Sequence, residues 1–358
     1  MNVAPRLSWF AFAVLVAVTC ARFSPAQAGA FDSLFGARTG RMPSLEGGTG
    51  WVNAPPVTRE ALRGKVVLVD FWTYSCINCL RTLPYVKAWA DKYKDAGLVV
   101  IGVHTPEFGF ERDNANVRKA VHHLDIGFPV VADGERRIWK AFGTQAWPTM
   151  VLVDAKGQEH SRQVGEGAYE DTERTIQRLL REAGGTKVPE GLVAPQGLGT
   201  QAAPGRERAR SGETYLGAAQ SHGFRATAGR LTAGAAGPFT PARNLSVNEW
   251  TLEGAWSVEA ERVCLRQGSG RIAHKFSARD LHLVLGPAMD GEAIAMRVLL
   301  DGKAPAGDRG FDVDAQGRGT ADVHRLYQLV RRSTSAGEQL FEIEFAKPGV
   351  CAYAFTFG

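Results

Sequence analysis

The sequence predicts an α/β domain over residues 60–184, followed by an all-β sandwich of jelly-roll type over residues 213–358. Two observations support this order. In the first region, runs of β-branched residues alternate with segments of helical spacing, the pattern of an α/β domain with a mixed sheet. In the second, about seven short apolar runs are separated by turn residues, which is typical of a β-sandwich.

The α/β region predicts strands and helices in alternation. Its apolar, β-branched runs predict strands at 65–72, 97–104 and 128–133, and a strand from 149 that turns at Lys156–Gly157 and returns to about Gly165. Helical spacing predicts helices at 79–94, 114–124, 135–142 and 169–184. The last ends at Gly184, since glycine stops a helix at little cost.

The β region is separated from the first by a change in composition. Residues 185–212 contain three prolines, several glycines and no periodicity, which predicts a flexible linker. Residues 29–59 are Gly-rich and are expected to be a lead-in. Strands are predicted at 256–265, 271–278, 281–286, 293–302, 326–332, 339–346 and 351–357.

The first 28 residues have the pattern of a cleaved signal peptide. Arg6 precedes an apolar run over residues 7–19, and "AQA" at 26–28 offers a cleavage site. The run is shorter than the roughly 20 residues that a spanning helix needs, although an uncleaved membrane anchor is the alternative. We therefore expect export to the periplasm. The charge of +5 includes two arginines of this segment, and so small an excess predicts no nucleic-acid partner.

Cys76 and Cys79 form a C-x-x-C pair directly after the first predicted strand. At the start of a helix, free backbone N–H groups and the helix dipole stabilise a thiolate. The first cysteine is therefore expected to attack, and Cys79, one turn later, to resolve the mixed disulfide.

Two other interpretations of the pair are weaker. A zinc site needs two more ligands, but Cys264 and Cys351 lie in the other region, so we expect no metal. Thr73 and Cys76 share the T-x-x-C spacing of peroxidases of the peroxiredoxin type. However, Val69 stands where that family has proline.

The motif "VDFWTYSCINC", with Pro84 and "WPT" at 147–149, resembles the active site of the thioredoxin superfamily. This implies that Asp70 is a buried acid that takes the proton from Cys79, that Pro84 kinks the helix, and that Pro148 is cis and faces the disulfide. The predicted strand and helix within 125–143 resemble an insertion of the TlpA and ResA type. The phrases "GVHTPEFGFE" and "AYAFTFG" resemble the soluble C-terminal portion of DipZ-type proteins, which carry a thioredoxin-like domain and a carbohydrate-binding-like β domain.

The same resemblance suggests where substrate binds. Trp72 and Trp147 are expected to flank the cysteines, beside Pro148 and Thr149, with core packing as the alternative for the tryptophans. His104 and Glu107 follow the second strand and are also candidates for substrate contact, with a loop-ordering role as the alternative.

The residues between the cysteines, Ile77 and Asn78, are uncharged, which argues against a strong oxidase. We therefore expect a reductant or isomerase acting on protein thiols and disulfides, with no cofactor. The DipZ resemblance implies a membrane electron donor of the CcdA or DsbD type.

The β region suggests a second role. Trp250, Trp256 and Tyr327 could form a stacking platform for a cell-envelope glycan, so the alternative function is an envelope glycan- or protein-binding module. In an oxidising compartment a disulfide between Cys264 and Cys351 is favoured over two buried thiols.

Overall fold

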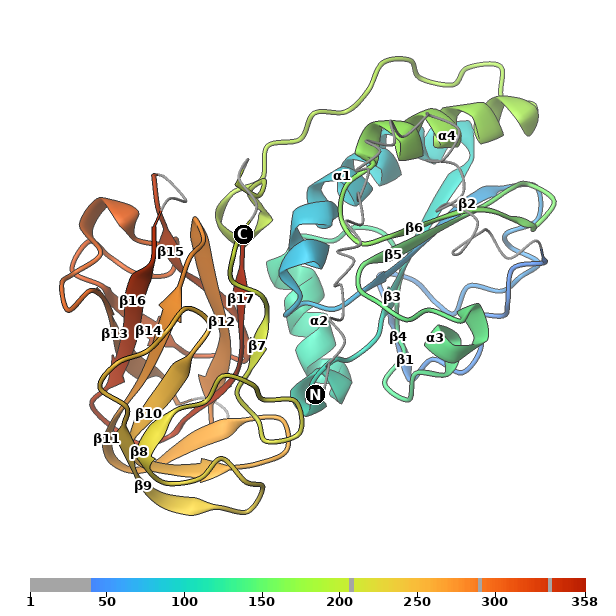
Figure 1. Cartoon of the computed structure of the whole chain (residues 1–358). Coiled ribbons are helices and arrows are strands. Elements are labelled where there is room, and N and C mark those ends of the chain that lie inside the picture. Colours follow the sequence, from blue (N-terminus) through green and yellow to red (C-terminus); the bar gives the residue numbers. More distant parts are fainter. Residues whose placement is uncertain (1–39, 206–208, 289–291, 334–336) are drawn as a thin grey trace, which may run out of the picture. The chain divides into compact units, whose positions relative to one another are not determined.

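The computed structural model describes residues 40–205, 209–288, 292–333 and 337–358 (Figure 1). These residues belong to one compact unit, residues 38–358. The predicted signal peptide at 1–28 lies outside the described residues. Within them, no helix is long and apolar enough to cross a membrane.

The α/β region contains a six-stranded sheet, which is mixed as predicted but has one strand more than expected. Strands β2, β3 and β4 are parallel to one another, and β1, β5 and β6 are antiparallel to their neighbours. In spatial order the strands are β1 (Gly50–Val52), β4 (Val130–Ala132), β3 (Leu98–His104), β2 (Val66–Trp72), β5 (Thr149–Val153) and β6 (Glu159–Val164). Because β2 is central, its seven residues are all buried.

Four helices cover the two faces of this sheet: α1 (Ile77–Tyr93), α2 (Asn114–His123), α3 (Arg137–Phe142) and α4 (Tyr169–Glu182). Side chains of a strand alternate between faces, so Val66, Leu68 and Trp72 pack with α1, α2 and α4. Val67, Val69 and Phe71 pack with α3 on the opposite face. Asp70 has the parity of the first set, which directs it toward α1.

The β region is an antiparallel sandwich, which confirms the predicted class. One layer has the order β14-β13-β16-β11-β10-β9-β8, and β12 joins β15 and β17 in the other, with β7 beside β17. Side chains from both layers form a shared apolar core. The strands are β7 (Thr214–Tyr215), β8 (Ala226–Ala228), β9 (Ala236–Pro241), β10 (Trp250–Val258), β11 (Val263–Phe276), β12 (Asp280–Pro287), β13 (Ile294–Leu300), β14 (Arg318–Ala321), β15 (Arg325–Arg331), β16 (Gln339–Phe345) and β17 (Val350–Phe357).

Two strand predictions in this region were wrong in their limits. The run 256–265 is a hairpin, because the Glu259 N–H donates to the Arg262 carbonyl and the chain turns there. The run 271–278 is the second half of the 14-residue strand β11. Strands β7, β8, β9 and β14 were missed, since β7 has only two residues and each of the other three has at most one buried residue, so none has a strong apolar pattern.

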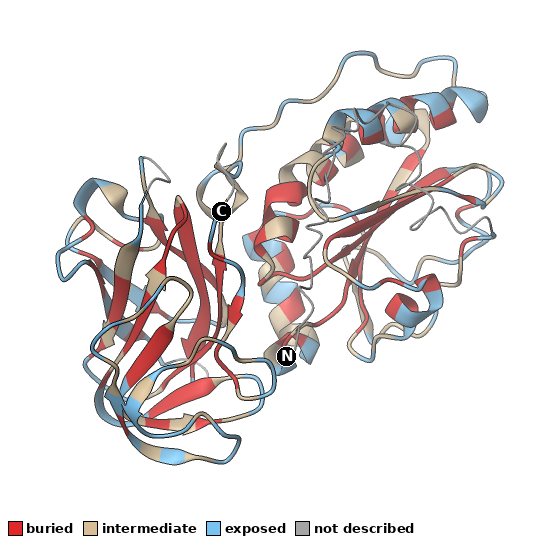
Figure 2. Cartoon of the chain, in the orientation of Figure 1, coloured by how far each residue is buried: buried red, intermediate tan, exposed pale blue. Residues whose placement is uncertain are grey.

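Strand β12 is buried on both sides (Figure 2). Leu281, Leu283 and Leu285 enter the sandwich core. Val284, on the other side, belongs to the cluster that contains the apolar residues of α1. The outer face of the smaller layer, which contains β12, therefore packs against the α/β region.

The segments before and between the two regions make specific contacts. The expected lead-in supplies β1, which pairs with β4. In the expected linker, the Gly191 carbonyl accepts hydrogen bonds from Lys92 and Gln177, each at 2.7 Å. The Gly199 carbonyl, in a short 3₁₀ turn, accepts one from Gln328 at 3.2 Å. These contacts hold the segment at two points, one on each region.

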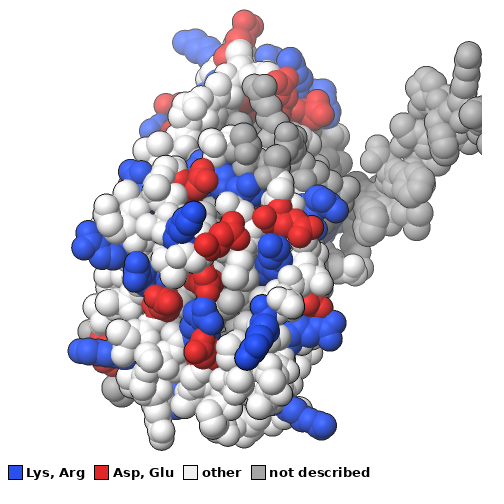
Figure 3. Space-filling view, turned by 60° about the vertical axis from the view of Figure 1, so that its left-hand side comes forward, with Lys and Arg blue, Asp and Glu red and all other residues white. Residues whose placement is uncertain are grey.

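Charges are mixed on the surface of the β region. Basic and acidic side chains are interspersed over the face shown in Figure 3, without a large area of one sign. Arg271 on β11, for example, lies 2.7 Å from Glu253 and also contacts Glu342.

Candidate active site

Cys76 lies at the start of α1, where the central strand passes into the helix. It is the N-cap residue of α1, and its side chain makes no capping hydrogen bond. The first N–H groups of a helix have no partner within the helix, so they and the dipole favour an anion at this position. Cys76 is half-buried, whereas Cys79 is buried, so Cys76 is the cysteine that is more open to a protein substrate.

Cys79 lies one turn further along α1 and is 3% exposed. Burial raises the pKa of its thiol well above the ordinary value, and a hydrogen bond with Cys76 adds to the shift. The two cysteines are not bonded to each other. Cys79 is therefore a protonated, protected thiol, and Cys76 is the more accessible of the two.

Asp70 lies beneath this pair, on β2. It is 3% exposed, and its Oδ1 atom has no hydrogen-bond partner among the described residues. Burial raises the pKa of this carboxyl to about 7. The charge of Asp70 in turn contributes to the raised pKa of Cys79, so the two groups interact. A carboxyl with this pKa can exchange a proton near neutral pH.

The loop before β5 approaches the end of β2. The peptide bond between Trp147 and Pro148 is cis, as the thioredoxin resemblance implies. Thr149 pairs with Phe71, and its hydroxyl donates to the Ala146 carbonyl at 2.7 Å. Pro84 lies within α1, as that resemblance also implies.

Glu111 was missed by the sequence analysis. Its buried carboxylate accepts hydrogen bonds from the Thr73 hydroxyl at 2.5 Å and the Ser75 hydroxyl at 2.6 Å. It also accepts from the backbone N–H groups of Glu107 at 2.7 Å and Phe108 at 3.0 Å. Burial raises the pKa of Glu111, and these hydrogen bonds oppose the shift. Glu111 thus connects the loop before Cys76 with the loop after β3.

The contact with Glu111 also bears on the peroxidase alternative. The Thr73 hydroxyl donates to Glu111 and lies 3.3 Å from His104 Nε2. Its donor is thus engaged within the protein, which argues against a role for Thr73 in binding a peroxide at Cys76.

Comparisons with known proteins agree with this geometry. A family described as Redoxin matches residues 43–180, and one described as Thioredoxin like C-terminal domain matches residues 211–358. Thiol-disulfide oxidoreductase YkuV of Bacillus subtilis is 33% identical over 142 residues, which cover 39% of this chain and 95% of YkuV.

The chain belongs to the thioredoxin-like thiol–disulfide oxidoreductases.

The similarity extends beyond the thioredoxin-like domain. Protein DipZ of Mycobacterium tuberculosis is 34% identical over 323 residues, or 89% of this chain. The matched part is 43% of DipZ, so the chain spans less than half the length of that relative. A solution structure of a thioredoxin-like protein in the oxidized form is 32% identical and covers 40% of this chain and 97% of that one, with a TM-score of 0.38.

Three side chains that were expected to contact substrate are buried in the structure. Trp72, His104 and Thr149 are at most 2% exposed, so these side chains have no surface for a substrate. The alternative roles apply instead: Trp72 is a core residue, and its ring lies edge-on to His104 at 5.2 Å. Burial lowers the pKa of His104 to about 3, which keeps the ring neutral.

Trp147 and Glu107 retain some exposure. The Trp147 indole donates to the Thr105 carbonyl at 3.1 Å and packs against Trp139. The Glu107 carboxylate accepts from the Tyr215 hydroxyl at 2.5 Å. Burial, followed by the charge of Glu213, raises the pKa of Glu107 to about 8. The loop after β3 is thereby linked to β7 of the sandwich.

The sandwich region contains the predicted disulfide and lacks the predicted sugar platform. Cys264 and Cys351 face each other on β11 and β17 and are bonded. Trp250, Trp256 and Tyr327 are fully buried in the sandwich core, so the expected stacking platform was wrong. Alternation along the strands turns these rings inward, away from any ligand.

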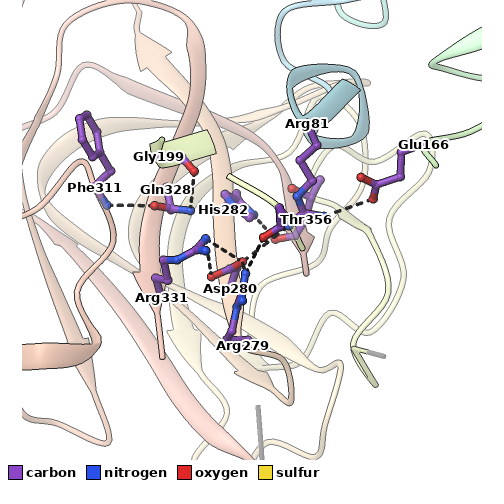
Figure 4. Close-up of polar contacts among 11 residues, drawn as sticks. Arg81, Glu166, Gly199, Arg279, Asp280, His282, Phe311, Gln328, Arg331 and Thr356 are labelled. Carbon is purple, nitrogen blue, oxygen red and sulfur yellow. Dashed lines mark hydrogen bonds and ion pairs between the residues drawn. The ribbon is translucent and has the colours of Figure 1, made fainter. Parts of the chain in front are cut away.

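A buried ionic network connects the redox helix to the sandwich (Figure 4). Arg81, two residues after Cys79, lies 3.4 Å from Glu166 and 3.7 Å from Asp280. Asp280 is fully buried and also contacts Arg279 at 2.7 Å and Arg331 at 3.3 Å. Removing one partner from a buried network leaves an uncompensated charge, so this contact favours one arrangement of α1 against β12.

The described residues contain no group of three or more His, Cys, Asp and Glu side chains that could hold a metal ion.

Proposed function

We propose that this protein is a periplasmic enzyme that reduces or isomerises disulfides of other proteins through Cys76 and Cys79. The observation that carries the proposal is a half-buried cysteine at a helix N-terminus, next to a buried cysteine and to a buried carboxyl whose Oδ1 atom has no hydrogen-bond partner among the described residues. The names of the relatives, thiol-disulfide oxidoreductase among them, support the same chemistry.

The reaction has two exchange steps. The Cys76 thiolate attacks one sulfur of the substrate disulfide, and the other substrate sulfur leaves as a thiolate that takes a proton from water. Cys79 then gives its proton to the Asp70 carboxylate and attacks the Cys76 sulfur. This releases the second substrate sulfur and forms the Cys76–Cys79 disulfide. Two electrons pass from the dithiol to the substrate.

The oxidised enzyme must be reduced again for a further turnover. We propose a membrane electron donor of the CcdA or DsbD type, because the chain resembles part of DipZ-type proteins. The periplasmic location is supported by the signal pattern at 1–28 and by the Cys264–Cys351 disulfide, since such bonds persist in oxidising compartments.

Trapping with model disulfide substrates tests the proposal. The wild type should reduce insulin, and Cys76→Ser should abolish this reduction. Cys79→Ala should accumulate a mixed disulfide in which the substrate is attached to Cys76. No reduction by the wild type, or trapping at another cysteine, would overturn the proposal.

Two further measurements separate the alternatives. Consumption of hydrogen peroxide at a rate above that of insulin reduction would favour the thiol peroxidase. A reduction potential near that of DsbA, about −120 mV, would make the enzyme an oxidant. The burial of Trp250, Trp256 and Tyr327 removes the aromatic platform of the glycan-binding alternative, which leaves it the family resemblance alone.

A further inference from the structure

A cavity of about 360 Å³ lies beside the redox helix, between the thioredoxin-like domain and the sandwich. Tyr74 and Leu80 line it from the redox side, and Lys119 and His123 line it from α2. The loop between β14 and β15 supplies Val323, together with Leu326 at the start of β15. The volume is within the range of ligand-binding pockets.

The cavity is close to the nucleophile along the chain. Tyr74 is two residues before Cys76, and the Leu80 N–H donates to the Cys76 carbonyl at 3.0 Å. An extended polypeptide covers about 3.3 Å per residue. A substrate held at Cys76 can therefore reach the cavity with a residue that is only a few positions from its reacting cysteine.

One part of the lining is apolar and accessible. Val323 is 45% exposed, one of the few large hydrophobic side chains at the surface of the described residues. Leu80 and Leu326 lie deeper, at 3% and 2% exposed. An aliphatic side chain that enters here would remove this apolar surface from water, which favours binding.

The polar groups of the lining favour an acidic partner. Lys119 and His123 are one helical turn apart on α2, exposed, and without an ion pair in the described part of the chain. The Tyr74 hydroxyl is buried and has no hydrogen-bond partner among the described residues. Burial raises the pKa of Tyr74, so the hydroxyl remains a donor.

The other charged groups of the lining are already engaged. Asp322, its single carboxylate, accepts a hydrogen bond from the Tyr327 hydroxyl at 3.1 Å. Arg325 is paired with Asp312 at 2.7 Å. The unengaged donors therefore belong to the thioredoxin-like domain, where a carboxylate of the substrate would meet Lys119 on α2.

We propose that this cavity is a recognition cleft for the substrate protein, which takes an aliphatic residue followed by an acidic one near the reacting cysteine. The inference rests on the proposed function and names its substrate class. It also assigns a role to the sandwich, which adds Val323 and Leu326 to the apolar part of the lining.

Matched cystine peptides test the inference on the full chain. Two probes differ only beside the reacting cysteine, with Leu-Glu in one and Leu-Lys in the other. The wild type should show a kcat/KM about tenfold higher for Leu-Glu, the effect of one charge-assisted hydrogen bond. Lys119→Glu should remove or invert this ratio. Arg118→Glu, the neighbouring exposed charge that does not line the cleft, should preserve it.

Two more variants test the walls of the cleft. Val323→Asp should lower kcat/KM for the Leu-Glu peptide and leave reduction of a small symmetrical disulfide unchanged. Tyr74→Phe should lower kcat/KM for Leu-Glu several-fold, with little effect on Leu-Lys. Equal rates for both peptides in the wild type, or equal effects of Lys119→Glu and Arg118→Glu, would overturn the cleft alone. Failure to reduce either peptide would overturn the proposed function, and the cleft with it.

Discussion

Asp70 and Glu111 are two carboxyl groups of the same domain, equally buried but differently bonded. The Oδ1 atom of Asp70 has no hydrogen-bond partner in the described structure, whereas Glu111 accepts from two hydroxyls and from backbone N–H groups. A buried carboxylate without donors is costly, so it tends to hold its proton. A buried carboxylate that accepts several hydrogen bonds instead fixes the segments that donate them. Asp70 is therefore available for proton transfer, whereas Glu111 holds the surrounding loops in place.

The largest expected effect is the pH dependence of stability caused by Asp70. Its pKa rises from 3.8 to about 7 on folding, so the folded state holds a proton that the unfolded state loses. Below pH 4 the carboxyl is protonated in both states and does not affect the free energy of unfolding. As the pH rises toward 7, the free energy of unfolding falls by up to about 1.4 kcal/mol per pH unit. Asp70→Asn should remove this loss.

Urea unfolding of both proteins between pH 4 and 8 measures this difference. The gap in unfolding free energy between Asp70→Asn and the wild type should widen up to about pH 7 and then stay constant. A gap that is the same at every pH would mean that the Asp70 carboxyl is not perturbed.

The next effect is on stability at Glu111. Glu111→Ala leaves several buried donors without an acceptor, so we expect a loss of about 3 kcal/mol in unfolding free energy at pH 7. Urea unfolding followed by tryptophan fluorescence measures it. Glu170→Ala, at an exposed carboxylate on α4, is the matched control and should change little. If both variants behave alike, Glu111 does not hold the two loops together.

A somewhat smaller effect is expected on the resolving step. Asp70→Asn cannot take the proton of Cys79, so release of a mixed disulfide should slow by about a hundredfold, in line with the usual contribution of a general base. Rapid-quench analysis of a preformed mixed disulfide measures the rate. The wild-type rate should rise as the pH passes through 7, and the variant should lack this inflection. If Asp70→Asn releases the mixed disulfide as fast as the wild type, then water and not Asp70 takes the proton of Cys79.

Local patterns in the sequence predicted a large part of the fold and of the site. The resemblance to thioredoxins implied that Asp70 is a buried acid, and alternation along the strand explains why the structure directs it toward α1. The C-x-x-C spacing places Cys76 and Cys79 one turn apart. These features depend on residues that are close in the chain, and periodicity reports them directly.

Other features depend on residues that are far apart in the chain. Glu111 stands in a polar segment and looks like a solvated residue until the fold brings Thr73 and Ser75 to it. Trp250 and Trp256 could have faced either side of the sandwich, and only the pairing of the layers placed them inside.

Local patterns and family resemblance were enough to predict the two fold classes, the redox pair and the buried acid. The contact of Arg81 with Asp280, and the place of Val323 in a cleft beside the redox helix, follow only from the fold. Burial and pairing between distant segments depend on how whole elements pack, and no local spacing in the chain records that packing.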